Sequence, residues 1–334
     1  MKINDGVYGE EEINEPILIE LINSESIQRL KNISQFGLPE KYFHRPVFSR
    51  YEHSLGVLIL LRRLNASLKE QIAGLLHDVS HTAFSHVIDW VVGDSLKGDY
   101  QDKILPKFIR NSDIPKILEK YNLDYEDVSD ISSFSFLEQE LPHLCADRID
   151  YSLREMVFFE SPEDISLILN SLKNYNSHIV FVSKKAAEIF AKAYMKCQRE
   201  NWGGSESRAR YHILSNILKK AIDRDIISLK DMEKTDTELI SVLEKSGDNE
   251  IIGGLNLLRN GFEVRKSNSG KGIVLKNNKF RFIDPMVFFN NNLKMLSEFS
   301  EEYHSFLEGE KRNYNNFKKI EIIPLNNQRL KNGN

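Results

Sequence analysis

The sequence predicts a mainly α-helical protein that ends in a smaller α+β portion, and three observations lead to this prediction. Apolar residues recur at helical spacing through most of residues 1–225. Beyond them, short alternating segments appear between Gly- and Asn-rich turns. The composition, 41% hydrophobic and 28% charged, is typical of a folded chain. We therefore expect a helical domain over residues 1–225 and an α+β region packed on it over residues 226–334, ending in a frayed tail.

Helices are predicted wherever apolar residues lie three and four positions apart. The segment 16–38 holds two of them, because Asn23 and Ser24 can end one helix and cap the next. Further helices follow the same pattern and are predicted over residues 51–68, 68–81, 113–122, 135–159, 161–173, 183–201 and 206–224.

Strands are predicted where β-branched residues alternate with other residues. One short strand is expected within residues 177–184, inside the helical domain. Two short helices are expected over residues 236–247 and 251–261. The stretch 262–289 is then expected to form strands joined by Gly and Asn turns.

Charge and cysteine content exclude several classes of protein. A formal net charge of −4 is not that of a general polyanion binder, so no nucleic acid partner is expected. The two cysteines, Cys145 and Cys197, are too few for a disulfide framework and fit a reducing compartment. The apolar run 55–61 is cut off by Arg62 and Arg63, far short of a membrane span. With no signal-like apolar segment near its start, the chain is expected to be cytoplasmic and not membrane-bound.

A cluster of three histidines and one aspartate follows directly behind an apolar run, and its members are His77, Asp78, His81 and His86. Imidazole and carboxylate groups resist burial unless a partner satisfies them. On a helix that continues through this stretch, His77 and His81 lie one turn apart, with Asp78 beside them. Neutral imidazole with carboxylate suits Mn, Fe, Zn or Mg, so the cluster indicates a divalent metal. For any single pair, a satisfied core histidine beside a surface carboxylate is the alternative.

Two further segments could complete such a site. His53 lies early in an apolar helix. Four polar residues recur at spacings that place them on one helix face, and they are Asp147, Asp150, Tyr151 and Arg154. A face with carboxylate, phenol and guanidinium groups suits an anionic ligand held over a metal. The alternative is that this run of charges is a solvated helix face.

Several of these residues resemble a known family. His53, the pair His77-Asp78 and Asp147 resemble the metal ligands of the HD-domain phosphohydrolases. Six segments also come in the order seen in one branch, the deoxynucleoside triphosphate triphosphohydrolases, which includes bacterial dGTPases and the animal SAM-and-HD-domain dNTPase. These segments are residues 3–9, 26–37, 49–57, 74–86, 147–151 and 280–287. The resemblance is scattered over residues 3–287 and implies an HD-domain helical bundle.

The resemblance implies a reaction and a metal site. Members of the branch hydrolyse a dNTP to a deoxynucleoside and inorganic triphosphate. A divalent metal (Mn, Fe, Mg or Zn) would be held by four side chains, those of His53, His77, Asp78 and Asp147. His81 and His86 would flank the α-phosphate, and one of them would protonate the departing 5′ oxygen. These two histidines and Asp78 are the implied catalytic residues.

The resemblance also implies a substrate pocket. The residues that would line it are Gln35, Phe36, Arg50, Arg148, Tyr151, Tyr211 and His212. The first two would lie against the deoxyribose, where a bulky side chain excludes a 2′-hydroxyl. The next three would hold phosphates or the sugar edge, and the last two would close the pocket. Family members commonly form dimers, tetramers or hexamers, so a homo-oligomer is expected.

The sequence departs from the family pattern at two places. Tyr100 and Gln101 stand where members usually carry a His-Glu pair that assists the catalytic histidines. Tyrosine is a poor base near pH 7, because its pKa is about 10. Positions for a nucleotide allosteric effector correspond to Asn4, Asn23, Gln28 and Lys31. Asn23 replaces an acidic residue that usually reads guanine, so an effector other than GTP, or none, is expected.

Three functions stay open at the level of sequence. The first is a metal-dependent dNTP triphosphohydrolase. The second is another HD phosphohydrolase, acting on a nucleoside monophosphate, a cyclic dinucleotide or a single-stranded nucleic acid. The third is a nucleotide-binding regulatory protein whose catalysis is weakened at Tyr100 and Gln101. The sequence contains neither the P-loop motif G-x-x-x-x-G-K-[ST] nor the G-x-S-x-G elbow of two rival classes.

Overall fold

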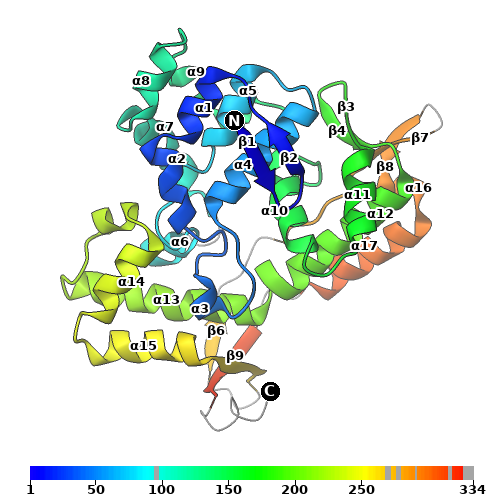
Figure 1. Ribbon diagram of the computed structural model, residues 1–334. Coiled ribbons are helices and arrows are strands. Elements are labelled where there is room, and N and C mark those ends of the chain that lie inside the picture. The colour runs from blue at the N-terminus through cyan, green and yellow to red at the C-terminus, as the bar shows by residue number, and fades with distance from the viewer. Residues whose placement is uncertain (94–97, 268–271, 276–279, 290–291, 315–317, 326–334) are drawn as a thin grey trace.

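The computed structural model describes residues 1–93, 98–267, 272–275, 280–289, 292–314 and 318–325, and the structural statements below concern these residues. Within them the chain is mainly α-helical and carries three small sheets (Figure 1). The predicted fold class, mainly α with a smaller α+β portion, is confirmed.

The helical segments are, in chain order, α1 (Pro16–Ile22), α2 (Glu25–Arg29), η1 (Leu30–Asn32), α3 (Glu40–Phe43), α4 (Arg50–Arg63), α5 (Leu68–Leu76), α6 (Val87–Val92), α7 (Tyr100–Arg110), α8 (Ile114–Glu119), α9 (Glu126–Ser129), η2 (Ile131–Ser133), α10 (Ala146–Met156), α11 (Pro162–Ser171), α12 (Lys184–Cys197), η3 (Gln198–Trp202), α13 (Ser205–Asp223), η4 (Leu229–Glu233), α14 (Asp236–Glu244), α15 (Asn249–Asn260), α16 (Leu296–Phe299) and α17 (Glu301–Asn313). The strands are β1 (Lys2–Asp5), β2 (Gly9–Glu12), β3 (Leu172–Tyr175), β4 (His178–Phe181), β5 (Phe262–Lys266), β6 (Ile273–Leu275), β7 (Met286–Phe289), β8 (Asn292–Met295) and β9 (Lys318–Pro324). The segments η1, η2 and η4 are 3-10 helices, and η3 is a π-helix.

The two helices that lead into the predicted site begin at serine caps. Ser49 and Glu52 form a capping box at the start of α4, in which each side chain accepts a hydrogen bond from the other residue's backbone N–H. Ser67 caps α5 by accepting from the Glu70 N–H. These caps fix where each helix starts, and α4 then packs against both α5 and α10.

The helix predicted to run through His81 is shorter in the structure, because α5 ends at Leu76. Beyond it, the His81 N–H bonds to the Asp78 carbonyl, three positions back rather than the four of an α-helix. Phe84 then takes a φ of 61°, which a right-handed helix cannot include. The prediction that His77 and His81 share one helix face was therefore wrong, and both lie in the turns that follow α5.

The helix predicted over residues 135–159 forms only in its second half, as α10. The Glu70 carboxylate accepts hydrogen bonds from the N–H groups of Phe136 and Leu137, at 2.7 and 3.2 Å. These backbone donors are thus satisfied without a helix, and Pro142 lacks an N–H altogether. A side chain from α5 therefore decides the path of the segment that precedes α10.

The strands pair into one hairpin and two larger sheets. β1 and β2 are antiparallel, β3-β4-β7-β8 form a sheet in which β4 and β7 are parallel, and β9 lies between β5 and β6. The strands predicted in residues 177–184 and 262–289 are confirmed, while residues 268–271 and 276–279, where Gly and Asn turns were predicted, lie outside the described residues. β9 was not predicted, because it lies in the expected tail and pairs Phe262 with Pro324 across a long sequence separation. The last part of that tail, residues 326–334, lies outside the described residues.

Two clusters of buried apolar residues form the interior. The first surrounds α4, α5, α10 and α12, and the second surrounds α13, α14 and α15 (Figure 1). The chain crosses between the two clusters more than once, and one crossing lies between Val79 and Ala83, within the predicted site. The second cluster contains Leu218 and Leu239, which lie on either side of residue 225. The domain boundary near residue 225 therefore stays a prediction.

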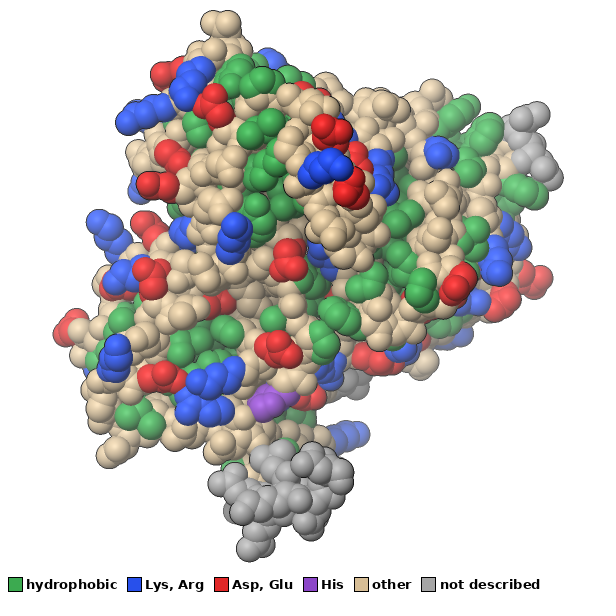
Figure 2. Space-filling view, in the orientation of Figure 1, with side chains coloured by type: hydrophobic (Ala, Val, Ile, Leu, Met, Phe, Trp, Pro, Cys, Tyr) green, Lys and Arg blue, Asp and Glu red, His purple; other side chains and the backbone are tan. Residues whose placement is uncertain are grey.

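The surface carries charges of both signs. On the face drawn in Figure 2, Lys and Arg side chains are interspersed with Asp and Glu. Among the described residues, no helix has the length and apolar character needed to cross a membrane.

Candidate metal centre

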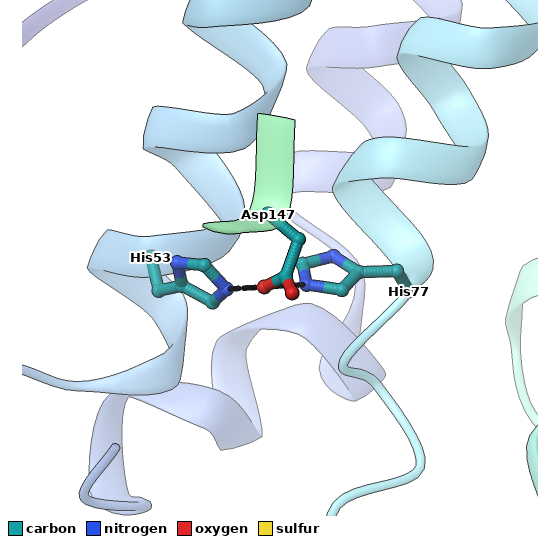
Figure 3. Close-up of side chains that lie close together, drawn as sticks. All are labelled: His53, His77 and Asp147. Atoms are coloured by element: carbon teal, nitrogen blue, oxygen red, sulfur yellow. Dashed lines mark hydrogen bonds and ion pairs between the residues drawn. The ribbon is translucent and has the colours of Figure 1, made fainter. Parts of the chain in front are cut away.

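Three side chains from different helical regions converge on one point (Figure 3). His53 comes from α4, His77 from the turn after α5, and Asp147 from the first turn of α10. His53 Nε2 lies 2.9 Å from Asp147 Oδ1 and 3.2 Å from His77 Nε2. Asp147 Oδ1 lies 3.5 Å from His77 Nε2. The three residues, which the sequence places far apart, are thus brought together as predicted.

The outer hydrogen bonds of the two imidazoles assign their tautomers. His77 Nδ1 donates to the Gly74 carbonyl at 2.7 Å, and His53 Nδ1 donates to Asp150 Oδ2 at 2.7 Å. When both rings are neutral, these outer bonds leave each Nε2 with a lone pair that faces the other ring and the Asp147 carboxylate. Lone pairs in this arrangement repel unless a cation lies among them, so the group fits a divalent metal.

The pocket attracts positive charge strongly. Burial by itself lowers the pKa of His53, but the hydrogen bonds with Asp147 and Asp150 outweigh burial and raise it to about 9. Burial likewise opposes ionisation of Asp147, yet the two histidines hold the pKa of this carboxyl well below its ordinary value. Nitrogen and carboxylate ligands suit Mn, Fe, Zn or Mg, so the particular metal stays open.

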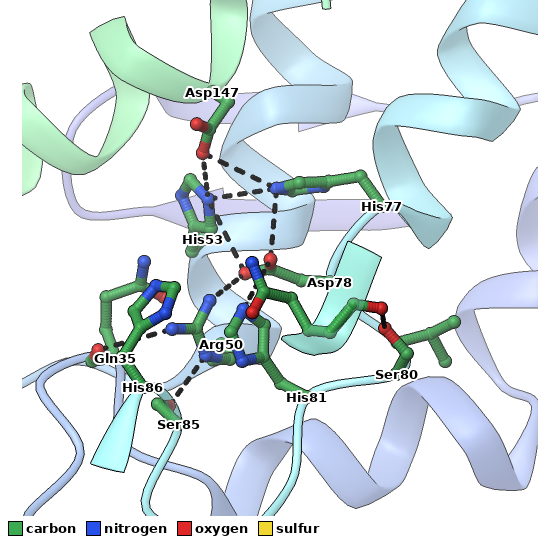
Figure 4. A network of polar contacts seen from close by, with 12 residues as sticks. Gln35, Arg50, His53, His77, Asp78, Ser80, His81, Ser85, His86 and Asp147 are labelled. Atoms are coloured by element: carbon green, nitrogen blue, oxygen red, sulfur yellow. Dashed lines mark hydrogen bonds and ion pairs between the residues drawn. The ribbon is translucent and has the colours of Figure 1, made fainter. Parts of the chain in front are cut away.

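Asp78 lies on the other side of the two imidazoles, between the metal ligands and the remaining histidines (Figure 4). Its Oδ1 lies 3.5 Å from His77 Nε2 and its Oδ2 lies 3.7 Å from His53 Nε2. The guanidinium of Arg50 donates to Oδ2 at 2.5 Å and to the Ser85 hydroxyl at 2.8 Å. The predicted role of Asp78 as a fourth ligand is compatible with these distances and stays a prediction.

His81 and His86 lie beside this group with their ring planes nearly perpendicular and their centroids 5.0 Å apart. His81 is buried, and burial followed by the charge of Arg50 holds the pKa of His81 well below its ordinary value. Its Nε2 lies 3.3 Å from Asp78 Oδ1, while its buried Nδ1 has no partner among the described residues. A neutral His81 with Nε2–H toward Asp78 thus presents a bare Nδ1 that can accept a hydrogen bond.

His86 has a carboxylate partner that the sequence reasoning missed. Its Nδ1 lies 3.4 Å from Asp89 Oδ2, and the same carboxylate accepts from the Tyr100 backbone N–H at 3.2 Å. The His86 side chain is 35% exposed, so it can meet a ligand that enters from solvent. The three-residue spacing between His86 and Asp89 was the available signal.

The loop that carries these histidines is held by one residue from before it in the sequence and one from after it. Arg29 Nη2 donates to the carbonyls of Val79 and His81, at 2.9 and 2.7 Å. The buried carboxylate of Asp236 accepts from the Phe84 N–H at 2.7 Å. Both contacts hold the backbone between α5 and α6 in its turns.

The predicted deoxyribose neighbours lie close to this loop. The Gln35 carbonyl is within 3.4 Å of Arg50 Nη2, and Gln35 Oε1 is buried with no partner among the described residues. Phe36 stacks on Phe43 at 5.3 Å and meets Phe48 edge-on at 5.1 Å. Their contact with a sugar stays a prediction.

The predicted phosphate-binding residues on α10 already have protein partners. Arg148 donates to the carbonyls of His143 and Gln139. The Tyr151 ring lies 6.3 Å from the His53 ring, and its hydroxyl lies 3.3 Å from that of Tyr194. Asp150 and Arg154, predicted to face a ligand on the same helix, are instead buried behind His53.

The two pocket residues predicted on α13 differ in setting. Burial raises the pKa of Tyr211 to about 12, and its ring lies 6.1 Å from that of Trp90. His212 Nε2 lies 3.0 Å from Asn216 Nδ2 at an exposed position one turn along the helix. Closure of a nucleotide pocket by these two residues stays a prediction.

The departure from the family pattern lies at the start of α7. Gln101 is buried, its carbonyl accepts from the Ser80 hydroxyl at 2.9 Å, and its Oε1 has no partner among the described residues. The next residue is Asp102. The pKa of its carboxyl is raised, because loss of surrounding water has a larger effect than the opposing charge of His86. Asp102 thus places an acidic group near the histidines, one position after the position where family members usually carry glutamate.

The residues predicted for an allosteric effector lie in the N-terminal part of the protein. Asn23 and Gln28 donate from their side-chain amides to the Ile19 and Ile22 carbonyls, and Lys31 lies over the Tyr51 ring. Asn4 pairs with Glu10 in the β1-β2 hairpin. An effector at these positions stays a prediction.

Comparisons with known proteins agree with this geometry. The protein-family model described as HD domain matches residues 50–149. The chain is 38% identical over 305 residues to the uncharacterized protein YdhJ of Bacillus subtilis, which covers 90% of this chain and 93% of that protein. It is 32% identical over 257 residues to the metal-dependent phosphohydrolase cns2 of Cordyceps militaris, with 74% of each chain covered.

Two further comparisons concern the fold and a more distant relative. A crystal structure of a phosphohydrolase from Bacteroides thetaiotaomicron matches with a TM-score of 0.74 at 18% identity, over 98% of this chain and 100% of that one. The deoxynucleoside triphosphate triphosphohydrolase SAMHD1 of Gallus gallus is 33% identical over 150 residues, or 38% of this chain and 24% of that protein. With the ligand group, the HD-domain match and the similarity to cns2 taken together, the chain belongs to the HD-domain metal-dependent phosphohydrolases.

Proposed function

We propose that this protein is a metal-dependent dNTP triphosphohydrolase, which releases a deoxynucleoside and inorganic triphosphate. The observation that carries the proposal is the arrangement of two histidines, His81 and His86, beside a divalent-metal site. A metal-dependent phosphoester hydrolase needs ligands for the metal and a proton donor for the leaving oxygen, and these side chains are suited to both tasks. The similarity to chicken SAMHD1 supports a dNTP as the substrate.

The metal would be held by His53, His77 and Asp147, with Asp78 as a further ligand. When bound, a divalent ion supplies Lewis acidity at a phosphoryl oxygen and lowers the pKa of water. Arg50 keeps Asp78 in place and adds positive charge next to the phosphate position.

The two remaining histidines are suited to different roles. Neutral His81, with its bare Nδ1, is suited to accept a hydrogen bond from water and so to orient it. His86, whose Nδ1 lies 3.4 Å from Asp89 Oδ2, is partly exposed and is placed to give a proton to the 5′ oxygen. Gln35 Oε1 and Gln101 Oε1, both buried and without partners, offer acceptors to a ligand's hydroxyl groups.

Two other functions remain as alternatives. The match to cns2, which covers more of the chain than the match to SAMHD1, favours some HD phosphohydrolase activity without specifying the substrate. A regulatory protein with weakened catalysis was suggested by Tyr100 and Gln101. The Asp89 carboxylate beside His86 argues against this last alternative, because the histidine keeps an acidic partner.

Product analysis tests the proposal. Each dNTP, alone and in mixtures, is incubated with the protein and Mn²⁺, Mg²⁺ or Fe²⁺, and deoxynucleoside and triphosphate are quantified by chromatography. We expect equal amounts of the two products. The His77→Ala variant should lose turnover, while His304→Ala, at an exposed position on α17, should retain it. Turnover only of other phosphoesters would favour the second function, and tight dNTP binding without turnover the third.

A further inference from the structure

A line of buried charges runs from the metal ligand His53 to the N-terminal hairpin. His53 Nδ1 donates to Asp150 Oδ2 at 2.7 Å, and Arg154 Nε donates to the same oxygen at 2.8 Å. Arg154 Nη2 then donates to Asp5 Oδ2 at 2.7 Å. Asp150 is fully buried, Arg154 is 4% exposed and Asp5 is 8% exposed. Water therefore does not screen these interactions as it would at the surface.

Residue spacing on α10 and a glycine on α4 make room for these buried charges. Asp150 and Arg154 lie one turn apart on α10, so they pair along the helix. Asp147, three residues before Asp150, binds the opposite ring nitrogen of His53. A Cβ at Gly56 on α4 would lie 1.9 Å from Asp150 Oδ1 and 2.1 Å from Arg154 Nη2. Glycine at position 56 therefore leaves the space that the ion pair occupies.

Asp5 joins the hairpin to these charges with both of its carboxylate oxygens. Oδ1 accepts from the N–H groups of Val7 and Tyr8, at 2.8 and 3.0 Å, and so fixes the turn between β1 and β2. Oδ2 accepts from Arg154. The hairpin contacts both α4, where Arg63 donates to the Tyr8 carbonyl, and α10, where Arg154 donates to Asp5 (Figure 1). These two helices carry His53 and Asp147.

We propose that Asp5 is a positioning residue of the metal centre, which acts through Arg154 and Asp150 on His53. This inference rests on the metal site of the proposed function but not on its substrate. Asp150 fixes the tautomer of His53 and makes Nε2 a better ligand. Arg154 withdraws part of the Asp150 charge, and Asp5 balances Arg154. When Asp5 loses its charge, Arg154 pairs more strongly with Asp150. Asp150 then accepts a weaker hydrogen bond from His53, and His53 binds the metal less tightly.

The test is the affinity of the metal-free full chain for Mn²⁺, measured by isothermal titration calorimetry without nucleotide. In Asp5→Asn the amide oxygen can still accept from Val7 and Tyr8, while the amide nitrogen faces Arg154. We expect the Kd for Mn²⁺ to rise about 3- to 10-fold in Asp5→Asn and about 10- to 100-fold in Asp150→Asn. Glu10→Gln, an exposed position of the same hairpin, should leave the Kd unchanged.

A double-mutant cycle separates positioning from a general structural role. If Asp5 acts through Arg154, the Asp5→Asn change should have little further effect on the Kd once Arg154→Gln is present. Additive effects of the two changes would overturn the proposal, as would a wild-type Kd in Asp5→Asn. The visible spectrum of bound Co²⁺ should also shift in Asp5→Asn and not in Glu10→Gln.

A substitute variant and a comparison with turnover separate the role of Asp5 from failure to fold and from the proposed function. If Arg154→Gln does not fold, Arg154→Lys replaces it, because lysine keeps the charge and loses the fork that contacts both carboxylates. A wild-type protein that binds Mn²⁺ but hydrolyses no dNTP would contradict the proposed function alone. The comparison of Kd values would then still decide the role of Asp5.

Discussion

The guanidinium of Arg50 and the carboxylate of Asp78 form an ion pair inside the protein, with side chains only 2% and 7% exposed. The same carboxylate lies 3.5 Å from His77 Nε2 and 3.3 Å from His81 Nε2. Arg50 therefore holds Asp78 between a candidate metal ligand, His77, and a candidate catalytic residue, His81. A buried pair of this kind is costly to break from one side, because the remaining charge loses its partner.

Replacing Arg50 with alanine is expected to lower the free energy of unfolding by about 3–5 kcal/mol, because Asp78 would stay buried without a countercharge. Urea unfolding of the metal-free protein measures this change. Arg265→Ala removes an exposed ion pair with Glu263 and should cost less than about 1 kcal/mol. Similar losses for the two variants would contradict the interpretation of the buried pair.

Removal of the metal is expected to destabilise the protein, because an ion that binds only the folded state stabilises it by mass action. At a free ion concentration of about 100 times the Kd, the stabilisation is about 2.7 kcal/mol. Thermal unfolding should thus show a lower Tm after chelation and recovery after Mn²⁺ is returned. His77→Ala should have a Tm that does not respond to Mn²⁺, and a response equal to that of the wild type would place the ion elsewhere.

Asp89→Asn tests the proton donor of the proposed reaction. The amide oxygen can still accept from the Tyr100 N–H, but the charge beside His86 is lost. We expect kcat for dNTP hydrolysis to fall about 10²-fold with little change in Mn²⁺ affinity. Asp223→Asn, at an exposed position of α13, serves as the control. An unchanged kcat would exclude Asp89 as the partner of a catalytic His86.

Asp236 is expected to give the stability of the protein a pH dependence. Burial raises the pKa of Asp236 to about 6, although its backbone hydrogen bonds oppose the shift. The folded state thus binds this proton more tightly than the unfolded state, where the pKa is about 3.9. Stability should fall as pH rises from about 4 to about 6, by an amount on the order of 3 kcal/mol.

Urea unfolding at several pH values checks this prediction against Asp236→Asn, which lacks the titrating group. The variant should lose the part of the slope that lies between about pH 4 and pH 6. Asp225→Asn is a matched control, since Asp225 is exposed and its φ of 55° suits asparagine. Parallel curves for the wild type and Asp236→Asn would rule out a role for this carboxyl.

Gly56→Ala should disturb the charges behind His53, because its Cβ would lie 1.9 Å from Asp150 Oδ1. We expect the free energy of unfolding to fall by about 1–3 kcal/mol and Mn²⁺ to bind more weakly. Gly253→Ala is the control on α15, where nothing lies within 4 Å of the added Cβ. That change should raise stability by about 1 kcal/mol, because alanine favours the helix. Equal effects at the two glycines would contradict the steric argument.

The sequence carried enough information for the helices that hold the metal ligands. Apolar spacing predicted α4 and the start of α5, and the polar face of α10 was visible at Asp147 and Asp150. The end of α5 at Leu76 was not predictable from spacing, since the turns after it depend on Arg29 and Asp236, which bind that loop from distant parts of the chain.

Pairings between distant residues account for most of what the sequence did not reveal. The bond between Asp5 and Arg154 joins residues 149 positions apart, and no local pattern indicates such a partner. β9 likewise forms because Phe262 and its neighbours supply an edge to pair with. A single sequence shows which residues could carry charge or pair as strands, but not which of them meet.

The hairpin β1-β2 limits how far this protein can be reduced in size. A fragment trimmed to the family-matched residues 50–149 would keep His53, His77 and Asp147. It would lose Asp5 and Arg154, and Asp150 would remain outside it as well. Such a minimal catalytic module would carry the ligands without the charges that orient them. If Asp5 positions the metal centre as proposed, a design that transplants this centre into another scaffold must bring the hairpin with it.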